Sequence, residues 1–359
     1  MTEESSLDAD GLLAGPRGRR LCLELATECD EAVSRAVCEL AYGLDPASGS
    51  SRVRFTFAAD DGGEPHSPAT LEALEGLLAG VDVSAITPAA VHRAFGLSVD
   101  FARYWQEPDG EDILAALPVV VAALRPLAEQ VVRMAPPWWS EPRRDVQWAI
   151  EWHDPGDRVT LDGDSARMLA EWGEVTACDE ARARIDRPVD PVASYSGTWW
   201  VAPSSALMTT GTTSDGEPVG LRLVEDSLGW EEAAAIPVRG VGRTFEIRGA
   251  EDWAELCRRF PLEVTASRRH DWYRVTGRDG RWLIPDWRRV AGEWDAVHLT
   301  VAAYLRAATR AIRVDDESAT MIAGWGPDAT LWLADVVRGG DGGRVGWCRD
   351  HSSATWRRG

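Results

Sequence analysis

The hydrophobic positions of the first 135 residues recur mostly at helical spacing. Between Leu21 and Leu44, apolar residues follow one another every three or four positions, and the charged residues lie largely outside that stripe. This pattern predicts a helix that ends at the turn-forming cluster Asp45–Gly49. Strict alternation of apolar and polar residues then predicts one strand over Arg52–Ala58.

Two sequence signals mark further helix starts. Ser67-Pro68 and Thr87-Pro88 each place a capping hydroxyl before a proline, which suits a first helical position because the amide there is unbonded in any case. The alanine-rich stretch from Asp112 to Met134 predicts another helix, bent or split at Pro118 or Pro126. The first part of the chain is therefore expected to be mainly helical.

From residue 138 onward, the pattern changes to short apolar stretches separated by glycine turns. Val146–Trp152 alternates as a strand does, and Ser165–Arg184 has helical spacing. Further strands are expected at Thr198–Val201, Val219–Val224, Arg243–Arg248, Trp272–Val275, Arg281–Ile284, Ala296–Thr300, Thr320–Ala323 and Thr330–Leu333. Short helices are expected at Ala250–Phe260, Asp286–Glu293 and Val301–Thr309. Strands and helices mixed in this way are typical of an α+β fold.

The tryptophans divide the chain. Only Trp105 of the 18 precedes residue 138, and a proline-rich stretch, 135–142, lies at the change. We therefore expect a mainly helical domain over 1–137 and a connecting strand–helix segment over 138–191. A tryptophan-rich α+β domain is expected over 192–338, and a flexible tail over 339–359.

The net charge leaves the expected fold unchanged, but it bears on the expected partners and location of the protein. The chain has 58 acidic and 38 basic residues, a net charge of −20, which argues against nucleic acid and favours docking on a basic protein partner. Its longest apolar run, Leu114–Leu124, is too short for a membrane span, which needs about 20 residues. The acidic start, 1–11, lacks the basic region of a signal peptide. We expect a cytoplasmic protein with neither membrane nor nucleic-acid contact.

Missing residue types exclude several chemistries. All 38 basic residues are arginine, and the chain has no lysine and no asparagine. A lysine Schiff base, a pyridoxal phosphate anchor, a P-loop and protein-kinase chemistry are therefore excluded. The six cysteines show no Cys-X-X-Cys spacing, so no zinc ribbon is expected, and no metal site is assigned.

Glu225 is a candidate catalytic residue. It follows the strand expected at Val219–Val224 and precedes Asp226, with Trp230 close behind. A carboxylate at a strand end beside a tryptophan suits stabilisation of a positive, sugar-like transition state. The same residues equally suit the N-terminus of a helix, where acids are preferred.

His298 and Asp328 are the other candidate catalytic residues. His298 lies on the strand face opposite Val297 and Leu299, where a histidine serves either as a general base or as a structural hydrogen-bonding group. Asp328 lies in a tight turn between Trp325 and Trp332, where it is the late acidic position of this half.

Arg222, Trp230 and Trp325 are the candidate cofactor-binding residues. Seventeen tryptophans in the last 222 residues exceed what packing requires, so some are expected to stack on a flat ring. Arg222 would then contact a diphosphate. Trp325 is equally consistent with a position in the core, since tryptophan is usually buried.

Several segments carry a resemblance to known proteins. Thr244–Ile247, Glu251–Trp253, Pro285–Trp287 and Trp294–Leu299 resemble, in layout, proteins of GC-rich bacteria and compact α+β ADP-ribosyltransferase domains. The resemblance covers roughly 197–338 and implies NAD as cofactor. The chain lacks a Ser-Thr-Ser run and a late Glu-X-Glu pair, so the catalytic triad of that family has no matching positions, and no catalytic residue is carried over.

Two hypotheses follow. The first is a cytoplasmic acidic protein that masks or docks on a basic partner, as the charge and the missing catalytic motifs favour. The alternative is an NAD-using, ADP-ribosyltransferase-like enzyme in the C-terminal half. A tryptophan-lined cleft with a convergent acid would favour the enzyme, and a flat acidic patch would favour the docking protein.

Overall fold

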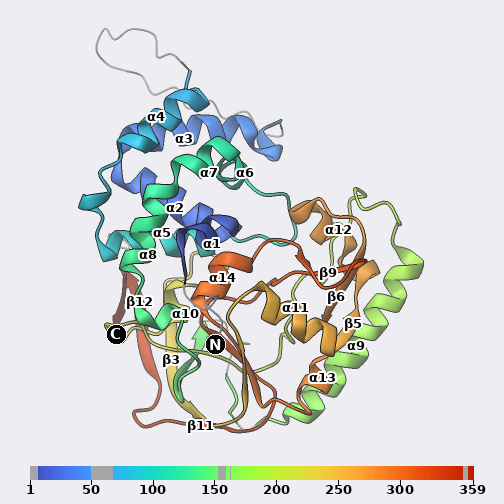
Figure 1. The fold of residues 1–359 in the computed structure, drawn as a ribbon. Coiled ribbons are helices and arrows are strands. Elements are labelled where there is room, and N and C mark those ends of the chain that lie inside the picture. Colours follow the sequence, from blue (N-terminus) through green and yellow to red (C-terminus); the bar gives the residue numbers. More distant parts are fainter. Residues whose placement is uncertain (1–6, 50–67, 153–158, 162, 351–354) are drawn as a thin grey trace.

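The fold is α+β, with a helical N-terminal region and a strand-rich C-terminal region. The computed structural model describes residues 7–49, 68–152, 159–161, 163–350 and 355–359. Figure 1 shows the first eight helices gathered at one end of the molecule and the strands toward the other. These helices are α1 (Ala9–Ala14), α2 (Pro16–Cys29), α3 (Glu31–Leu44), α4 (Leu71–Gly80), α5 (Pro88–Asp100), α6 (Gly110–Ala116), α7 (Pro118–Ala123) and α8 (Arg125–Met134).

Caps and prolines set the helix boundaries. Thr87 caps α5 as expected, since its Oγ1 accepts a hydrogen bond from Ala90 N at 3.2 Å. The expected split of 112–134 is confirmed, because α7 begins at Pro118 and α8 carries a proline in its first turn. The single helix expected over Leu21–Leu44 is wrong: Asp30 ends α2 and caps α3 through Ala32 N. The strand expected at Arg52–Ala58 lies outside the described residues.

A nine-stranded sheet forms the centre of the C-terminal region. Its order is β13-β12-β3-β1-β2-β10-β7-β4, and β11 also pairs with β3. The strands are β1 (Val146–Trp152), β2 (Met208–Thr210), β3 (Glu232–Gly240), β4 (Thr244–Ile247), β7 (Ala296–Leu299), β10 (Ala329–Trp332), β11 (Val337–Gly339), β12 (Val345–Asp350) and β13 (Thr355–Arg358). Neighbouring strands are antiparallel except β4 and β7.

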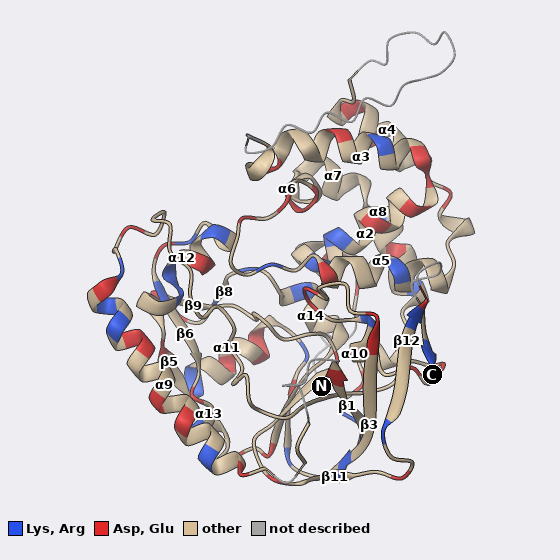
Figure 2. Ribbon diagram, turned by 180° about the vertical axis from the view of Figure 1, so that it is seen from behind, with Lys and Arg blue, Asp and Glu red and all other residues tan. Residues whose placement is uncertain are grey.

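A smaller sheet and six helices pack around this centre. The sheet has the order β5-β6-β9-β8, with β5 (Pro261–Glu263), β6 (Arg281–Pro285), β8 (Ile312–Arg313) and β9 (Ser318–Thr320). The helices are α9 (Ser165–Asp186), α10 (Val219–Arg222), α11 (Ala250–Arg259), α12 (Thr265–Thr276), α13 (Trp287–Val290) and α14 (Val301–Ala307). Figure 2 shows α9 along one edge, with acidic and basic positions interspersed along it.

Several expected elements of this half differ from the structure. Val219–Val224 begins with the short helix α10, which buries Val219 and lets Arg222 pair with Glu217 at 2.9 Å. The strand expected at Trp272–Val275 is wrong, because these residues belong to α12, which Gly277 ends at φ +66°. Segment 198–201 forms no strand. The segment expected to be a flexible tail contains β12 and β13, and β12 pairs with β3.

One hydrophobic core runs through both regions. Helix α14 contributes fully buried residues such as Tyr304 and Leu305, and it packs against α1 and α2. Ten of the 18 tryptophans are buried: 138, 139, 253, 272, 282, 287, 325, 332, 347 and 356. The other eight are partly exposed. Among the described residues, no helix combines the length and the apolar character that crossing a bilayer requires.

Arg17 of α2 joins the two regions from inside. Its guanidinium is 1% exposed, forms an ion pair with Asp112, and donates hydrogen bonds to Ser98 O at 2.8 Å and to Thr309 Oγ1 at 3.2 Å. Ser98 lies in α5, whereas Thr309 follows α14. A buried cation with all these partners fixes how the helical region sits on α14.

Arg17→Ala is therefore expected to lower the free energy of unfolding by about 1–3 kcal/mol, because it removes the buried hydrogen bonds to Ser98 O and Thr309 Oγ1, whereas Asp112 keeps its ion pair with Arg20. Urea unfolding followed by circular dichroism measures this change. Arg167→Ala is the control, since the Arg167–Glu171 pair on α9 is exposed. Equal losses in the two variants would contradict the role given to Arg17.

Candidate functional site

The alternation of β1 supplies the floor of a cavity. Trp148, Ile150 and Trp152 share one face of this strand and are partly exposed, whereas Gln147 and Ala149 point to the opposite, buried face. The tryptophan-bearing face lines a cavity of about 370 Å³. We call it the tryptophan cavity.

Two further indoles form its wall. Trp105, which follows α5, and Trp199 lie with their ring centroids 4.7 Å apart. The ring of Tyr104 stacks on that of Trp199, with 5.6 Å between the centroids and 14° between the planes. Aromatic contacts of this kind hold the rings rigidly. The cavity therefore has four indoles from three separate parts of the chain.

Glu225 lines the same cavity. Its Oε1 accepts hydrogen bonds from the hydroxyls of Tyr104 and of Tyr304, the latter at 2.9 Å. Burial raises the pKa of the Glu225 carboxyl to about 7, although both hydroxyls and Arg17 act to lower it. Burial also raises the pKa values of both tyrosines well above 10, so the tyrosines keep their protons and act as donors.

Glu225 has no ion-pair partner among the described residues, in contrast to its neighbour. Asp226 faces Arg103, with 3.5 Å between Oδ1 and Nη2. Asp226 and Leu228 both have positive φ, at 50° and 52°, so the loop after α10 holds an uncommon conformation. Such strain in non-glycine residues is typical of functional loops.

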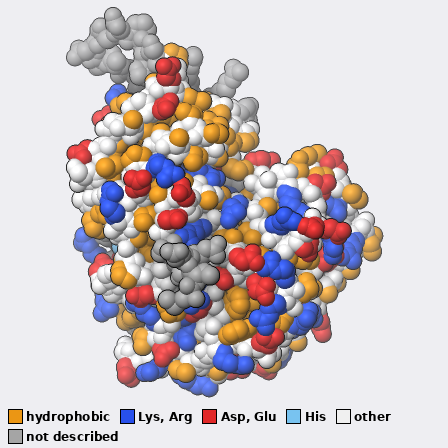
Figure 3. All heavy atoms as spheres, viewed as in Figure 1, with side chains coloured by type: hydrophobic (Ala, Val, Ile, Leu, Met, Phe, Trp, Pro, Cys, Tyr) orange, Lys and Arg blue, Asp and Glu red, His pale blue; other side chains and the backbone are white. Residues whose placement is uncertain are grey.

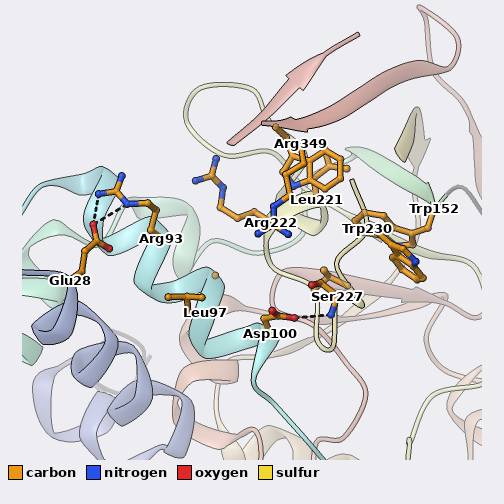
Figure 4. Close-up of a pocket in the computed structure, with 13 residues that line it drawn as sticks. Glu28, Arg93, Leu97, Asp100, Trp152, Leu221, Arg222, Ser227, Trp230 and Arg349 are labelled. Carbon is orange, nitrogen blue, oxygen red and sulfur yellow. Dashed lines mark hydrogen bonds and ion pairs between the residues drawn. The ribbon is translucent and has the colours of Figure 1, made fainter. Parts of the chain in front are cut away.

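A second cavity of about 340 Å³ adjoins the first, with which it shares Trp152 and Val224. Figure 4 shows Trp152 and Trp230 side by side at one end and the ion pair of Glu28 and Arg93 at the other. The rings of Trp152 and Trp230 lie 4.8 Å apart. We call this the arginine cavity, because Arg222 and Arg349 also line it.

The structure brings together three of the predicted site residues. Glu225 lines the tryptophan cavity, and Arg222 and Trp230 line the adjoining arginine cavity. Trp325 lies elsewhere: it is fully buried, its indole N–H donates to Ala329 O at 3.1 Å, and its ring meets Trp253 edge-on. Only its backbone amide is near the site, where it lowers the pKa of Glu225.

His298 and Asp328 meet behind the tryptophan cavity. His298 Nδ1 lies 2.7 Å from Glu246 Oε2, and Nε2 lies 3.4 Å from Asp328 Oδ1. Burial lowers the pKa of His298, but its contacts with Asp328 and Glu246 outweigh this and raise it to about 9. Asp328 also accepts a hydrogen bond from Gly211 N at 2.7 Å. Neither His298 nor Asp328 is among the residues that line the two cavities.

This arrangement joins three strands through a buried charge cluster. Glu246 is on β4, His298 on β7 and Asp328 directly before β10, and His298 pairs in register with Glu246 across the sheet. A protonated imidazole between two carboxylates is electrostatically satisfied. His298, the predicted general base, therefore forms a cross-strand ion pair at neutral pH.

The site contains contacts that sequence reasoning did not single out. Tyr104 and Tyr304 are 200 positions apart and belong to different regions, and a lone tyrosine gives no periodic or motif signal. Trp199 lies in an irregular segment. Among the described residues, no cluster of histidine, cysteine and carboxylate side chains is arranged to hold a metal ion.

The chain matches no protein-family model, no curated protein and no solved structure.

The charge cluster predicts a pH dependence of stability. The pKa of His298 is about 9 in the folded protein and about 6.5 when unfolded. Between these two pH values, His298 is protonated in the folded protein and neutral in the unfolded chain. This proton stabilises the folded state by on the order of 3 kcal/mol below pH 6.5, and the stabilisation is lost as the pH rises to 9. Urea unfolding from pH 6 to 9.5 measures it. In His298→Gln, this part of the pH dependence is expected to vanish; an unchanged slope would contradict the assignment.

Proposed function

We propose that this protein is an enzyme that acts on a small organic molecule bound in the tryptophan cavity. The observation that carries the proposal is Glu225, which lines the cavity and whose carboxyl has a pKa of about 7 and no ion-pair partner among the described residues. A group whose pKa lies near the working pH both accepts and returns a proton efficiently. Strongly shifted pKa values in a cavity are typical of functional sites.

The surroundings suit Glu225 to this role. Tyr104 and Tyr304 both donate to Oε1, which fixes the orientation of the carboxylate. The four indoles offer flat, apolar surfaces to a substrate ring. In the ionised form, Glu225 stabilises positive charge that develops on a bound molecule, and in the protonated form it serves as an acid.

Fewer observations support the hypothesis of an acidic docking protein. A net charge of −20 favours a basic partner, but Figure 3 shows acidic and basic side chains interspersed on the face that it presents. This face offers no concentrated acidic surface that would select such a partner. The tryptophan cavity with Glu225 in its lining therefore supports an enzyme better.

A base-sensitive probe tests the proposal. 5-Nitrobenzisoxazole loses its ring proton to a base while its N–O bond opens, and the phenolate that forms is coloured. We expect this protein to accelerate the reaction by about 10²–10⁴ over buffer. The rate should rise with pH around 7, because the ionised carboxylate is the base.

Glu225→Gln should remove the acceleration while keeping the shape of the side chain. Glu171→Gln, which changes an exposed carboxylate on α9, should retain it. A wild-type rate equal to that of buffer, or an equal rate in Glu225→Gln, would overturn the role of Glu225 as a base.

NAD is a second candidate ligand, because one observation favours it. The residues expected to bind it, Arg222 and Trp230, line the cavity that adjoins Glu225. Arg222 is already paired with Glu217 through Nε and Nη2, so a diphosphate would have to compete with that carboxylate.

Titration calorimetry with NAD and an assay for released nicotinamide test this candidate. An NAD-using transferase should bind NAD and release nicotinamide, and Arg222→Ala should weaken binding about tenfold, as expected for one lost charge-assisted contact. If titration of the wild-type protein with NAD produces no heat and the assay detects no nicotinamide, NAD is excluded as a ligand. The proposed role of Glu225 is then tested by the benzisoxazole reaction alone.

A further inference from the structure

The described charged residues that line the tryptophan cavity are all acidic. Among the described residues that line it, two are acidic, Glu225 and Asp226, and none is arginine or histidine. Arg103 neutralises Asp226 from the rim at 3.5 Å. Glu225 is left as a carboxylate inside the cavity with no ion pair in the described part of the chain. A ligand that carries a positive charge would supply the missing partner.

The indoles favour the same kind of ligand. The face of an indole ring attracts cations more strongly than other aromatic rings do, and the attraction grows when water is excluded. Trp105, Trp148, Trp152 and Trp199 all line this cavity and are partly exposed. At the rim, the guanidinium of Arg103 already lies 5.7 Å from the ring centre of Trp105.

An anionic ligand fits the cavity poorly. It would meet two carboxylates and the electron-rich faces of four indoles, and the described part of the lining has no basic residue to offset them. Three arginines, Arg93, Arg222 and Arg349, line the adjoining arginine cavity. An anionic group of a longer ligand would therefore lie there.

We propose that the tryptophan cavity selects an organic cation, a molecule with a quaternary or alkylated ammonium or pyridinium group. The positive group lies among the indoles, and Glu225 is its counter-ion. This inference rests on the proposed function, since it names the ligand class of that same cavity.

The competing arrangement is a protonated Glu225 that donates a hydrogen bond to a neutral ligand. The two arrangements have opposite pH dependence. A cation binds more tightly above pH 7, where Glu225 is ionised, and a neutral acceptor binds more tightly below it. The other groups that face Glu225 are Tyr104, Tyr304 and Arg17, together with Asp226 and its partner Arg103. Both tyrosines stay protonated over pH 6–8, because burial raises their pKa values, and Arg17 stays charged, because the effect of burial, which lowers its pKa, is outweighed by Asp112, which raises it.

Choline and its uncharged isostere 3,3-dimethyl-1-butanol separate the two arrangements. Binding of each to the full chain is measured by tryptophan fluorescence and by calorimetry at pH 6 and pH 8. We expect choline to bind at least about tenfold more tightly than the isostere, and more tightly at pH 8 than at pH 6. Glu225→Gln should weaken choline binding about tenfold and remove its pH dependence, whereas Glu171→Gln should leave both unchanged.

Two results would overturn the cation inference. Equal binding of the two probes, or tighter binding of the isostere at pH 6, would show that the cavity prefers a neutral ligand, and the proposed function would stand. Failure of both probes to bind would also overturn it. In that case, the benzisoxazole rate shows whether the proposed function fails as well. The comparison between pH 6 and pH 8 in the wild-type protein needs no variant to fold.

Discussion

The structure around the candidate site depends on one carboxyl group that neutral donors hold, with no ion-pair partner among the described residues. Glu225 lies between Tyr104 of the helical region and Tyr304 of α14, and both hydroxyls donate to the same oxygen. Neutral donors orient the carboxylate without fixing it in the charged state, so burial keeps its pKa near 7. An arginine in their place would have paired the carboxylate permanently and removed its capacity to exchange a proton.

This arrangement requires the two regions of the chain to be fixed against one another. Arg17 donates hydrogen bonds to Ser98 of α5 and to Thr309, which follows α14. Tyr104 of the helical region and Tyr304 of α14 both donate to Glu225. The tryptophans serve two purposes in this frame. Ten are buried, and five of the eight partly exposed ones, 105, 148, 152, 199 and 230, line the two adjoining cavities together with the buried Trp356.

Local signals in the sequence predicted much of the fold. Thr87, Pro118 and the alternation of β1 identified their elements, because caps, prolines and period-two patterns act over a few residues. Predictions of secondary structure failed where tertiary packing determined whether a segment became a strand or a helix. Residues 272–275 favour a strand by composition, yet they complete α12, and α10 forms where Arg222 turns back to Glu217.

The site was predicted in part for the same reason. Glu225, Arg222 and Trp230 are close in sequence, so one segment indicated all three. The tyrosines that hold Glu225 come from distant segments, and nothing local in the sequence marks them. The sequence identifies His298 and Asp328 as candidate reactive groups. Their partner Glu246 lies on a neighbouring strand, and a single segment of sequence does not reveal how strands pair. Trp325 proved to be a core residue.

Infrared difference spectroscopy of the carboxyl band, recorded as wild type minus Glu225→Gln over pH 4 to 9, tests the central claim most directly. The account predicts that the signal of a protonated carboxylic acid persists at pH 6 and disappears with a midpoint near 7. A midpoint near the ordinary glutamate value of about 4.3 would contradict it, because Glu225 would then be an ordinary carboxylate with no capacity for proton exchange at neutral pH.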